Sequence, residues 1–454
     1  MKKLEKVAII SLGCSKNLVD SECMTSILKS DGFTLITEYE KADIVVINTC
    51  GFIESAKSEA IDTILDVAAY KKPKGHISYI IATGCLAQRY PNEIRKSLPE
   101  VDAVVGTSHY QDISAVIRKL INQEKYNWND YISRAGSLDH MQTDRIVSTK
   151  VFAWLKIAEG CSNGCAFCAI PRIRGKYISR PMEDILAEAK NLVSKGYKEI
   201  ILAAQDTTSY GKDLYKKKCL PELLNKLSKI KGDFKIRIMY AYIDGITDEL
   251  IHEMSKNKKV LHYLDIPVQH GDDEILKKMR RRDTVKSITN TLSALRTAMP
   301  DIVIRSTVMV GFPGEKKENF DNLIENIQKW RFQALGCFIY SPEENTLGYD
   351  MHPRVRKDVS ERRYNKVMEI QQEISLRYNQ DRIGKIVNVT IDSDSDDGIF
   401  YIGRSEKEAP EVDSVILVAS TIRPLQIGDE VKVRIMDCTP YELTGVTIED
   451  ESAK

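Results

Sequence analysis

Short runs of β-branched residues alternate with amphipathic stretches along most of the chain, and this alternation restricts its fold more than any other feature. In residues 1–121 the apolar runs are "VAIISLGC", "ADIVVINTCGF" and "SYIIATGCL", and a helix-like stretch follows each of them. A strand, a helix and a second strand in this order form the repeating unit of a parallel sheet. The sequence therefore predicts an α/β fold that begins with an N-terminal parallel-sheet domain.

The same alternation resumes in residues 150–380. Six candidate strands occur there, namely "FAWLKIA", "EIILAAQ", "FKIRIMY", "LHYLDIP", "IVIRSTVMV" and "ALGCFIY". Six β/α repeats are too few for a closed eight-unit barrel. We expect a partial (βα)6 barrel with an open side that admits a large substrate, followed by a long helix over 360–380.

The C-terminal part of the chain follows a different pattern. Residues 381–449 contain five short strands separated by turns, which is typical of a small OB-like barrel. From 381 to the end there are 16 Asp or Glu and 8 Lys or Arg, a net charge of −8. Such a barrel repels phosphate and favours a basic protein surface, although a solvated acidic face explains the charge equally well. Residues 122–149 are polar without a clear period and are predicted to be a linker.

Composition limits the class of protein further. A chain of 454 residues is too long for a single domain with one hydrophobic core, so several domains are expected. Its 66 basic and 65 acidic residues give no overall positive potential of the kind that binds nucleic acid. No apolar run approaches the roughly 18 residues of a membrane-spanning helix, and the N-terminal run "VAIISL" is too short for a secretory signal. We expect a cytoplasmic protein without a membrane partner, whose reduced cysteines serve metals or catalysis.

Three cysteines stand close together in "CSNGCAFC", residues 161–168. Cys161, Cys165 and Cys168 follow the first predicted barrel strand, at the end where barrel enzymes carry their chemistry. A zinc site would need a fourth ligand, and three buried thiols would not be surrounded by Ser, Asn and Gly. Three thiolates on a four-iron cluster leave one iron open for a substrate or cofactor. An iron–sulfur cluster with an open iron is therefore the favoured interpretation, ahead of zinc and of buried thiols.

Three further cysteines lie far apart in the sequence but at equivalent places. Cys14, Cys50 and Cys85 each end one N-terminal strand, in "LGC", "NTC" and "TGC". The carboxyl ends of parallel strands share one edge of the sheet, so these thiols should converge. A single cysteine at such a place is as often a small core residue. The threefold recurrence favours a second cluster, again with three protein ligands.

The spacing C-x3-C-x2-C with Phe167 before the last cysteine resembles the motif of radical S-adenosylmethionine enzymes. The resemblance implies that S-adenosylmethionine occupies the open iron and is cleaved to a radical that abstracts hydrogen from an unactivated carbon. It also implies glycine-rich contacts late in the barrel, for which "MVGFPGE" is the candidate. The expected contacts of S-adenosylmethionine are Phe167, Gln205, Asp206, Gly311, with Gly314 beside it, and Glu315.

Two cysteine triplets, a partial barrel and a C-terminal β-barrel together resemble the methylthiotransferases over essentially the whole chain. The resemblance implies two 4Fe-4S clusters, S-adenosylmethionine, an N-terminal cluster domain over 1–121, a radical domain over 150–380 and a TRAM domain over 381–449. An electron donor and a sulfur source are implied as partners. The remaining cysteines are expected to be structural, namely Cys23, Cys219, Cys337 and Cys438.

Two substrate classes exist among the methylthiotransferases. One group modifies an isopentenylated adenosine of tRNA, and the other modifies the β-carbon of an aspartate in small-subunit ribosomal protein number twelve, either free or within the ribosome. The wording "GCSKNLVDSE", "ATGCLAQRY", "AQDTTSYG" and "LDIPVQH" is similar to the second group, although Ser15 stands where that group commonly has proline. "GRSEKEAPEVDS" fits both groups. The acidic tail also favours a basic protein, while direct contact with RNA is left open.

Overall fold

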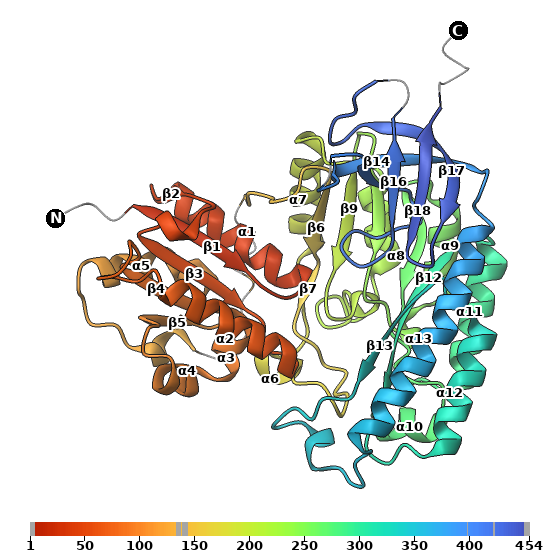
Figure 1. Cartoon of the computed structure of the whole chain (residues 1–454), viewed down its shortest axis with the longest axis horizontal. Coiled ribbons are helices and arrows are strands. Elements are labelled where there is room, and N and C mark those ends of the chain that lie inside the picture. Colours follow the sequence, from red (N-terminus) through yellow and green to blue (C-terminus); the bar gives the residue numbers. More distant parts are fainter. Residues whose placement is uncertain (1–4, 133–137, 139–143, 397, 421–422, 449–454) are drawn as a thin grey trace.

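The computed structural model describes residues 5–132, 138, 144–396, 398–420 and 423–448. Two stretches of the predicted linker 122–149, residues 133–137 and 139–143, lie outside the described residues, as does residue 449 at the end of the predicted TRAM domain. Figure 1 shows the N-terminal sheet beside a larger α/β unit, with the C-terminal barrel above it.

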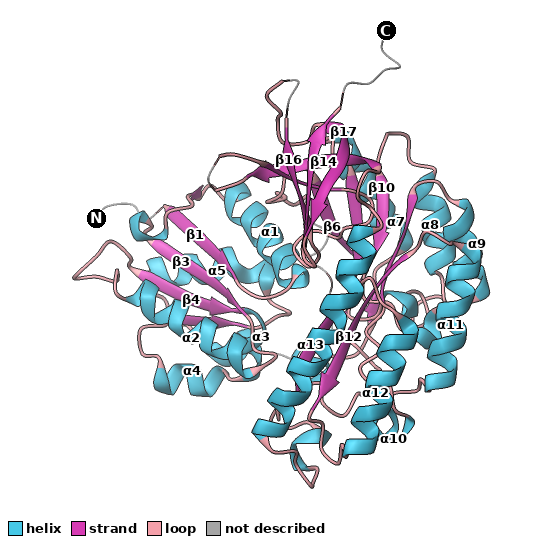
Figure 2. Ribbon diagram, turned by 45° about the vertical axis from the view of Figure 1, so that its right-hand side comes forward, coloured by secondary structure: helices cyan, strands magenta, loops and turns pink. Residues whose placement is uncertain are grey.

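The N-terminal part is a five-stranded parallel sheet in the order β2-β1-β3-β4-β5. Its strands are β1 Lys6–Ser11, β2 Thr34–Leu35, β3 Ile44–Thr49, β4 Tyr79–Thr83 and β5 Ala103–Val105. Its helices are α1 Ser15–Ser30, α2 Glu54–Ala68, α3 Gly84–Arg89, α4 Pro91–Ser97 and α5 Ile113–Ile121. β3 is buried along its whole length, because apolar residues of α2 cover one face of the sheet and those of α1 and α5 cover the other (Figure 2).

The central part is a six-stranded parallel sheet in the order β13-β12-β11-β10-β9-β6, with β13 and β6 at its two edges. The strands are β6 Phe152–Lys156, β9 Glu199–Ala203, β10 Lys235–Ile238, β11 Val260–Asp265, β12 Val303–Val310 and β13 Ala334–Ile339. The helices between them are α7 Met182–Ser194, α8 Leu220–Ser228, α9 Asp248–Lys256, α10 Asp273–Lys278, α11 Val285–Ala298 and α12 Lys317–Trp330. The predicted partial barrel is confirmed.

A short hairpin follows the first barrel strand and carries the cysteine loop. It pairs β7 Ala158–Glu159 with β8 Ile178–Ser179, and the four-residue helix α6 Ile170–Ile173 lies between them. The loop that begins at Gly160 is therefore closed at its base by two strands.

Helix α13, Lys357–Gln380, leads from the barrel to a closed five-stranded barrel in the order β14-β15-β16-β18-β17. The strands are β14 Ile386–Asp394, β15 Tyr401–Arg404, β16 Val415–Ala419, β17 Glu430–Cys438 and β18 Glu442–Thr447. The predicted small C-terminal β-barrel is confirmed.

Helix α1 fills part of the inner face of the central sheet. Its Val19 and Cys23 pack with Trp154 of β6 and Tyr263 of β11, and Ala409 from the loop after β15 joins the same apolar cluster. The inner face of the open barrel is thus covered by a helix of the N-terminal part and a loop of the C-terminal part. Among the described residues, no helix combines the length and the apolar character needed to cross a membrane.

Candidate active site

The loop of residues 160–169 gathers the first cysteine triplet at the carboxyl end of the first barrel strand. Cys161 and Cys165 are buried and Cys168 is half-buried, and all three are free thiols. The Cys161 amide donates to the Gly175 carbonyl at 3.1 Å, and the Ala166 amide donates to the Met279 carbonyl at 2.9 Å. These bonds hold the start and the middle of the loop against the segment before β8 and the end of α10.

The thiols of this triplet influence one another electrostatically. The pKa of Cys161 is raised to about 11, mainly by burial, with a smaller contribution from Cys165 and against the opposing effect of a hydrogen bond from the Asn163 amide. Burial also raises the pKa of Cys168 far above its usual value, with Cys165 and Cys161 adding to the effect. Cys161 and Cys168 therefore resist ionisation in the protein without metal, and a positively charged metal centre would displace their protons on binding.

Asp206, in the segment that follows β9, supports the cysteine loop. Its Oδ2 accepts a hydrogen bond of 2.8 Å from Asn163 Nδ2, and Asn163 lies between Cys161 and Cys165. On the other side, Arg282 Nη2 donates to Asn163 Oδ1 at 2.6 Å. Asp206 thus lies next to the loop, and its carboxylate is engaged by protein donors.

Gln205 lies beside Asp206 and faces a charged group. Its Nε2 donates to Glu159 Oε1 at 3.2 Å, while its buried Oε1 has no hydrogen-bond partner within the described parts of the chain. A buried acceptor without a donor is the kind of group that a polar ligand satisfies.

The glycine-rich segment after β12 is shaped by Glu315. The carboxylate accepts from the amides of Gly311 at 2.5 Å and Phe312 at 3.1 Å, and Arg363 Nη1 donates to it at 3.0 Å. Burial raises the pKa of Glu315 to about 7, against the opposing effect of Arg363 and the two amides. Gly311 has φ +77°, and a Cβ there would lie 2.3 Å from Ser360 Oγ of α13. The glycine is therefore required by backbone conformation and by the close approach of a helix.

Phe167 lines a cavity of about 480 Å³ between the two larger parts of the protein. The cavity is mainly apolar, with Phe52, Ile53, Glu54 and Ser55 from the segment after Cys50 on one side. The barrel supplies the other side, and its lining residues are Phe167, Gln269, Thr307, Met309, Phe338, Ile339, Ser341 and Glu343. The cavity thus reaches from the segment after Cys50 to the segment that carries Cys168.

The second cysteine triplet lies at the carboxyl edge of the N-terminal sheet. Cys14 follows β1, Cys50 follows β3, and Cys85 lies in the first turn of α3, directly after β4. A Cβ on Gly13 would lie 2.7 Å from Cys50 Cβ and 3.0 Å from Cys50 Sγ, which shows how closely two of these segments approach. The Cys85 thiol donates to Asn17 Oδ1 at 3.6 Å.

The charges around the second triplet differ from those around the first. Burial raises the pKa of Cys85 to about 11, while Arg174 opposes that effect and Cys14 and Cys50 add to it. The side chain of Cys14 is exposed at its surface, while its sulfur is partly desolvated by the surrounding protein atoms. This burial disfavours the thiolate, but Lys16 and Arg174 outweigh it and hold the pKa of Cys14 below its usual value.

The side chains of both triplets have the donor chemistry of iron–sulfur cluster ligands. In the described part of the chain, no group of three His, Cys, Asp or Glu side chains converges closely enough to hold one ion. A four-iron cluster takes each thiolate on a different iron, so its ligands stand further apart. Each set of three free thiols on closely packed loops has the donor chemistry that such a cluster requires.

Several residues of the site were not predicted from the sequence. Asn17, Lys156, Glu159 and Arg174 form a buried polar group between the two triplets. The short "GCSKNLVDSE" segment contains Asn17, and Arg174 lies six residues after Cys168. Proximity to a cysteine motif was the available signal, but it does not indicate which polar side chain turns inward.

Three family models match the chain in the order of its three parts. The model described as "Uncharacterized protein family UPF0004" covers residues 6–106, the Radical SAM superfamily covers 155–327, and the TRAM domain covers 383–448. Among solved structures, the chain is similar to the radical S-adenosylmethionine methyltransferase TsrM from Kitasatospora setae, with a TM-score of 0.55 and 11% identity over 76% of this chain and 77% of that one. Fold and superfamily together define the class, that of radical S-adenosylmethionine enzymes.

Curated relatives narrow the class to a family. The chain is 47% identical to the ribosomal protein uS12 methylthiotransferase RimO of Acetivibrio thermocellus over the full length of both. It is 48% identical to the RimO protein of a Thermoanaerobacter species over 97% of this chain and the whole of that one. The chain belongs to the RimO family of methylthiotransferases, which confirms the membership expected from its motifs. The match to the Radical SAM superfamily implies S-adenosylmethionine as a cofactor, and the similar TsrM structure contains cobalamin and a [4Fe-4S] cluster.

Proposed function

We propose that this enzyme attaches a methylthio group to the β-carbon of an aspartate of ribosomal protein uS12 in the cytoplasm. The observation that carries the proposal is the similarity to RimO proteins along the entire chain, at 47% identity. The net charge of −8 in the C-terminal part also favours a basic ribosomal protein as the partner.

We further propose two clusters, one held by Cys161, Cys165 and Cys168 and an auxiliary one held by Cys14, Cys50 and Cys85. When bound, the clusters and S-adenosylmethionine supply the radical chemistry that an unactivated carbon–hydrogen bond requires. The reaction also needs two external partners, a one-electron donor and a sulfur source.

The protein contributes positioning and exclusion of water. Asp206 and Arg282 hold Asn163 from two sides and so fix the loop of the first triplet. Gln205 offers its free Oε1 to a polar group of S-adenosylmethionine, and Phe167 offers its ring. We propose that Glu315 acts indirectly, by orienting the amides of Gly311 and Phe312. The substrate aspartate enters the cavity between the two triplets, whose apolar lining keeps water from a reactive intermediate.

A deletion strain tests the substrate. We expect mass spectrometry to show loss of the methylthio group from uS12 and unchanged tRNA, with recovery when the intact chain is supplied again. Loss of the modification from tRNA alone would contradict the proposal and favour an isopentenyladenosine substrate.

Iron analysis tests the two clusters. The anaerobically reconstituted chain should hold about eight irons, and about four after replacement of either triplet by alanine. Cys438→Ala is the matched control, because this half-buried cysteine lies in the C-terminal barrel, and it should leave the iron content unchanged. A total of four irons in the intact chain would refute the second cluster.

A further inference from the structure

Arg174 joins the two cysteine triplets. It follows α6, six residues after Cys168, and its side chain is only 1% exposed. The guanidinium donates to Asn17 Oδ1 at 2.5 Å and to Asp20 Oδ2 at 3.0 Å, both on α1 of the N-terminal part. Its Nη1 donates to both oxygens of Glu159, at 3.1 and 3.0 Å. An arginine of the hairpin that carries the first triplet therefore reaches the surroundings of the second triplet.

Asn17 touches the segments of all three auxiliary cysteines. Its Nδ2 donates to the Leu12 carbonyl at 2.9 Å, just before Gly13 and Cys14, and to the Thr49 carbonyl at 3.1 Å, just before Cys50. Its Oδ1 accepts from the Cys85 thiol and from Arg174. Arg174 thus orients the Asn17 amide, and this amide forms hydrogen bonds to the segments of Cys14, Cys50 and Cys85.

The charges around Arg174 are balanced and buried. Lys156 of β6 is fully buried, and its ammonium contacts Asp20 Oδ1 at 2.5 Å and also Glu159. Two cations and two carboxylates therefore share one enclosed site. Lys156 neutralises part of the charge of both carboxylates, so Nη2 of Arg174 can donate a hydrogen bond to Asn17 as well as to Asp20. Removing one member of such a group is costly, because the remaining charges stay buried without full compensation.

We propose that Arg174 and Asn17 are positioning residues through which the hairpin of β7 and β8, which carries the first triplet, sets the geometry and the electrostatic environment of the auxiliary cluster. The inference rests on the second cluster of the proposed function but not on its substrate. Two effects follow. The amide of Asn17 holds the three cysteine segments at the spacing that the cluster needs, and the positive charge of Arg174 favours the more negative, reduced state of the cluster.

The test uses the full-length chain with Cys161, Cys165 and Cys168 replaced by alanine, so that all bound iron reports on the auxiliary triplet. This reference should hold about four irons per chain. Adding Arg174→Gln together with Asp20→Asn removes one cation and one carboxylate, so the buried site stays neutral. We expect this variant to lose at least half of its iron, or to keep it with a more negative midpoint potential in an EPR-monitored redox titration.

Two single substitutions separate the two effects. Arg174→Lys keeps the charge but cannot reach Asn17 and both carboxylates at once, so iron content should fall while the midpoint potential of the remaining cluster stays near the reference. Asn17→Asp keeps the shape but cannot donate to the Leu12 and Thr49 carbonyls, so it should lose iron.

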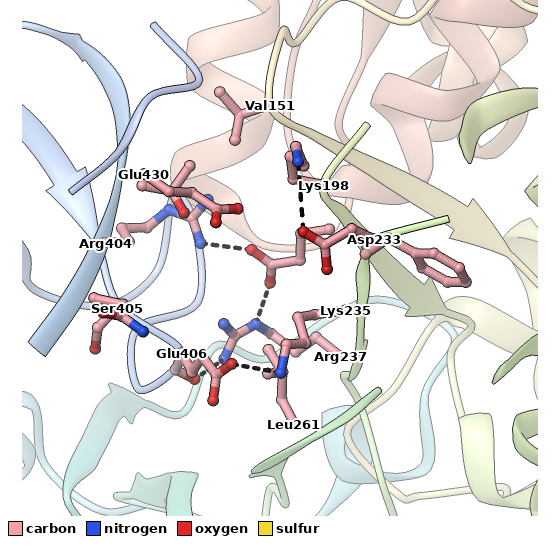
Figure 3. A pocket seen from close by; sticks show the side chains of 14 residues that line it. Val151, Lys198, Asp233, Lys235, Arg237, Leu261, Arg404, Ser405, Glu406 and Glu430 are labelled. Atoms are coloured by element: carbon pink, nitrogen blue, oxygen red, sulfur yellow. Dashed lines mark hydrogen bonds and ion pairs between the residues drawn. The ribbon is translucent and has the colours of Figure 1, made fainter. Parts of the chain in front are cut away.

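The matched control is a buried ion pair at the opposite end of the barrel strands. Arg237 Nε contacts Glu199 Oε1 at 2.5 Å where β9 and β10 begin, and Arg404 of the C-terminal barrel contacts the other oxygen of Glu199 at 3.0 Å (Figure 3). Arg237→Gln with Glu199→Gln should keep the iron content and potential of the reference.

Two results would overturn the inference alone. One is an unchanged cluster in the Arg174→Gln, Asp20→Asn variant, and the other is an equal loss of iron in the Arg237→Gln, Glu199→Gln control. A reference chain that binds no iron would instead refute the second cluster itself, and with it this inference. Circular dichroism of each variant shows whether the chain has folded.

Discussion

His270 illustrates how much a single buried residue can contribute to the behaviour of this protein. Its side chain is fully buried, and neither ring nitrogen has a hydrogen-bond partner within the described residues. The pKa of His270 is lowered to about 3, mainly by burial; Asp272 opposes this effect and Arg363 adds to it. The imidazole is therefore neutral in the folded protein at neutral and mildly acidic pH.

This burial predicts a pH-dependent stability. Between about pH 6.5 and pH 3 the unfolded chain binds a proton at His270 that the folded chain does not, so the free energy of unfolding falls as the pH falls. From pH 7 to pH 5.5 the loss from this residue is about 1 kcal/mol. Calorimetry at pH 7 and pH 5.5 measures the free energy of unfolding at each pH. The decrease between the two pH values should be smaller for His270→Gln than for the native chain. An identical difference would contradict the prediction.

Glu315 is a second residue with an effect beyond its own position. Its carboxylate holds two amides of the glycine-rich turn and pairs with Arg363 of α13. Both oxygens of the Glu315 carboxylate accept hydrogen bonds, whereas Glu315→Gln turns an NH2 group toward either Arg363 or the two amides. We therefore expect a stability loss of about 1–3 kcal/mol and weaker binding of S-adenosylmethionine. Anaerobic calorimetric titration measures the binding.

The exposed Glu318, at the start of α12, provides the control for this substitution. Glu318→Gln should bind S-adenosylmethionine as the native chain does. Native affinity in Glu315→Gln would show that the turn keeps its shape without the carboxylate.

At the scale of whole elements, one glutamate fastens the N-terminal helices to the barrel. Glu343, in the segment after β13, is 2% exposed and contacts Arg89 of α3 at 2.7 Å and Lys57 of α2 at 3.2 Å. Glu343 also lines the cavity between the two triplets. The distance between the two cysteine triplets therefore depends on an ion-pair contact between elements that are far apart in the sequence.

Breaking this contact should slow the reaction more than it weakens cofactor binding. We expect Glu343→Gln to reduce turnover at least about tenfold, because small displacements of reacting groups are costly, and to increase hydrogen exchange in α2 and α3. The side chain of the exposed neighbour Glu344 accepts a single long hydrogen bond within the described residues, from the Tyr90 hydroxyl at 3.4 Å, so Glu344→Gln is the control. Equal exchange in both variants would contradict the prediction.

At the scale of the whole molecule, the C-terminal barrel is joined to the central sheet by buried polar contacts. Asp413 contacts Arg305 of β12 at 2.7 Å and accepts a 2.5 Å hydrogen bond from the Tyr263 hydroxyl of β11. Ala409 of the same loop belongs to the apolar cluster on the inner face of the sheet. This loop, part of "GRSEKEAPEVDS", therefore completes the core of the barrel in addition to its place in the TRAM domain.

Removing the Asp413 contact should destabilise the central part as well as the C-terminal barrel. We expect Asp413→Ala to lower the free energy of unfolding by about 3 kcal/mol, since Arg305 and Tyr263 lose a buried partner. Denaturation followed by tryptophan fluorescence reports on Trp154 and Trp330 of the central part and on Trp128 of the N-terminal part, and hydrogen exchange reports on the C-terminal strands. Glu430→Gln, at an exposed position of β17, is the control. A loss of stability confined to the C-terminal strands would contradict the prediction.

The sequence by itself determined the parts of this protein that depend on local pattern. Strand and helix periodicity predicted the two parallel sheets and the closed C-terminal barrel, because burial on one or two faces leaves a regular spacing of apolar residues. The spacing of Cys161, Cys165 and Cys168 indicated a cluster loop, since ligands within eight residues need little help from the rest of the chain. The roles of these residues as cluster ligands stay predictions.

Only the tertiary structure decided which distant residues meet. Arg174 and Asn17 are separated by 157 positions, and nothing in their local sequence shows that one completes the surroundings of the other. Helix α1 covers the inner face of a sheet to which it is not adjacent in sequence, and Glu315 faces backbone amides and an arginine. The physical reason is that such contacts depend on how elements pack and in which direction each side chain leaves its backbone, and periodicity along the chain encodes neither.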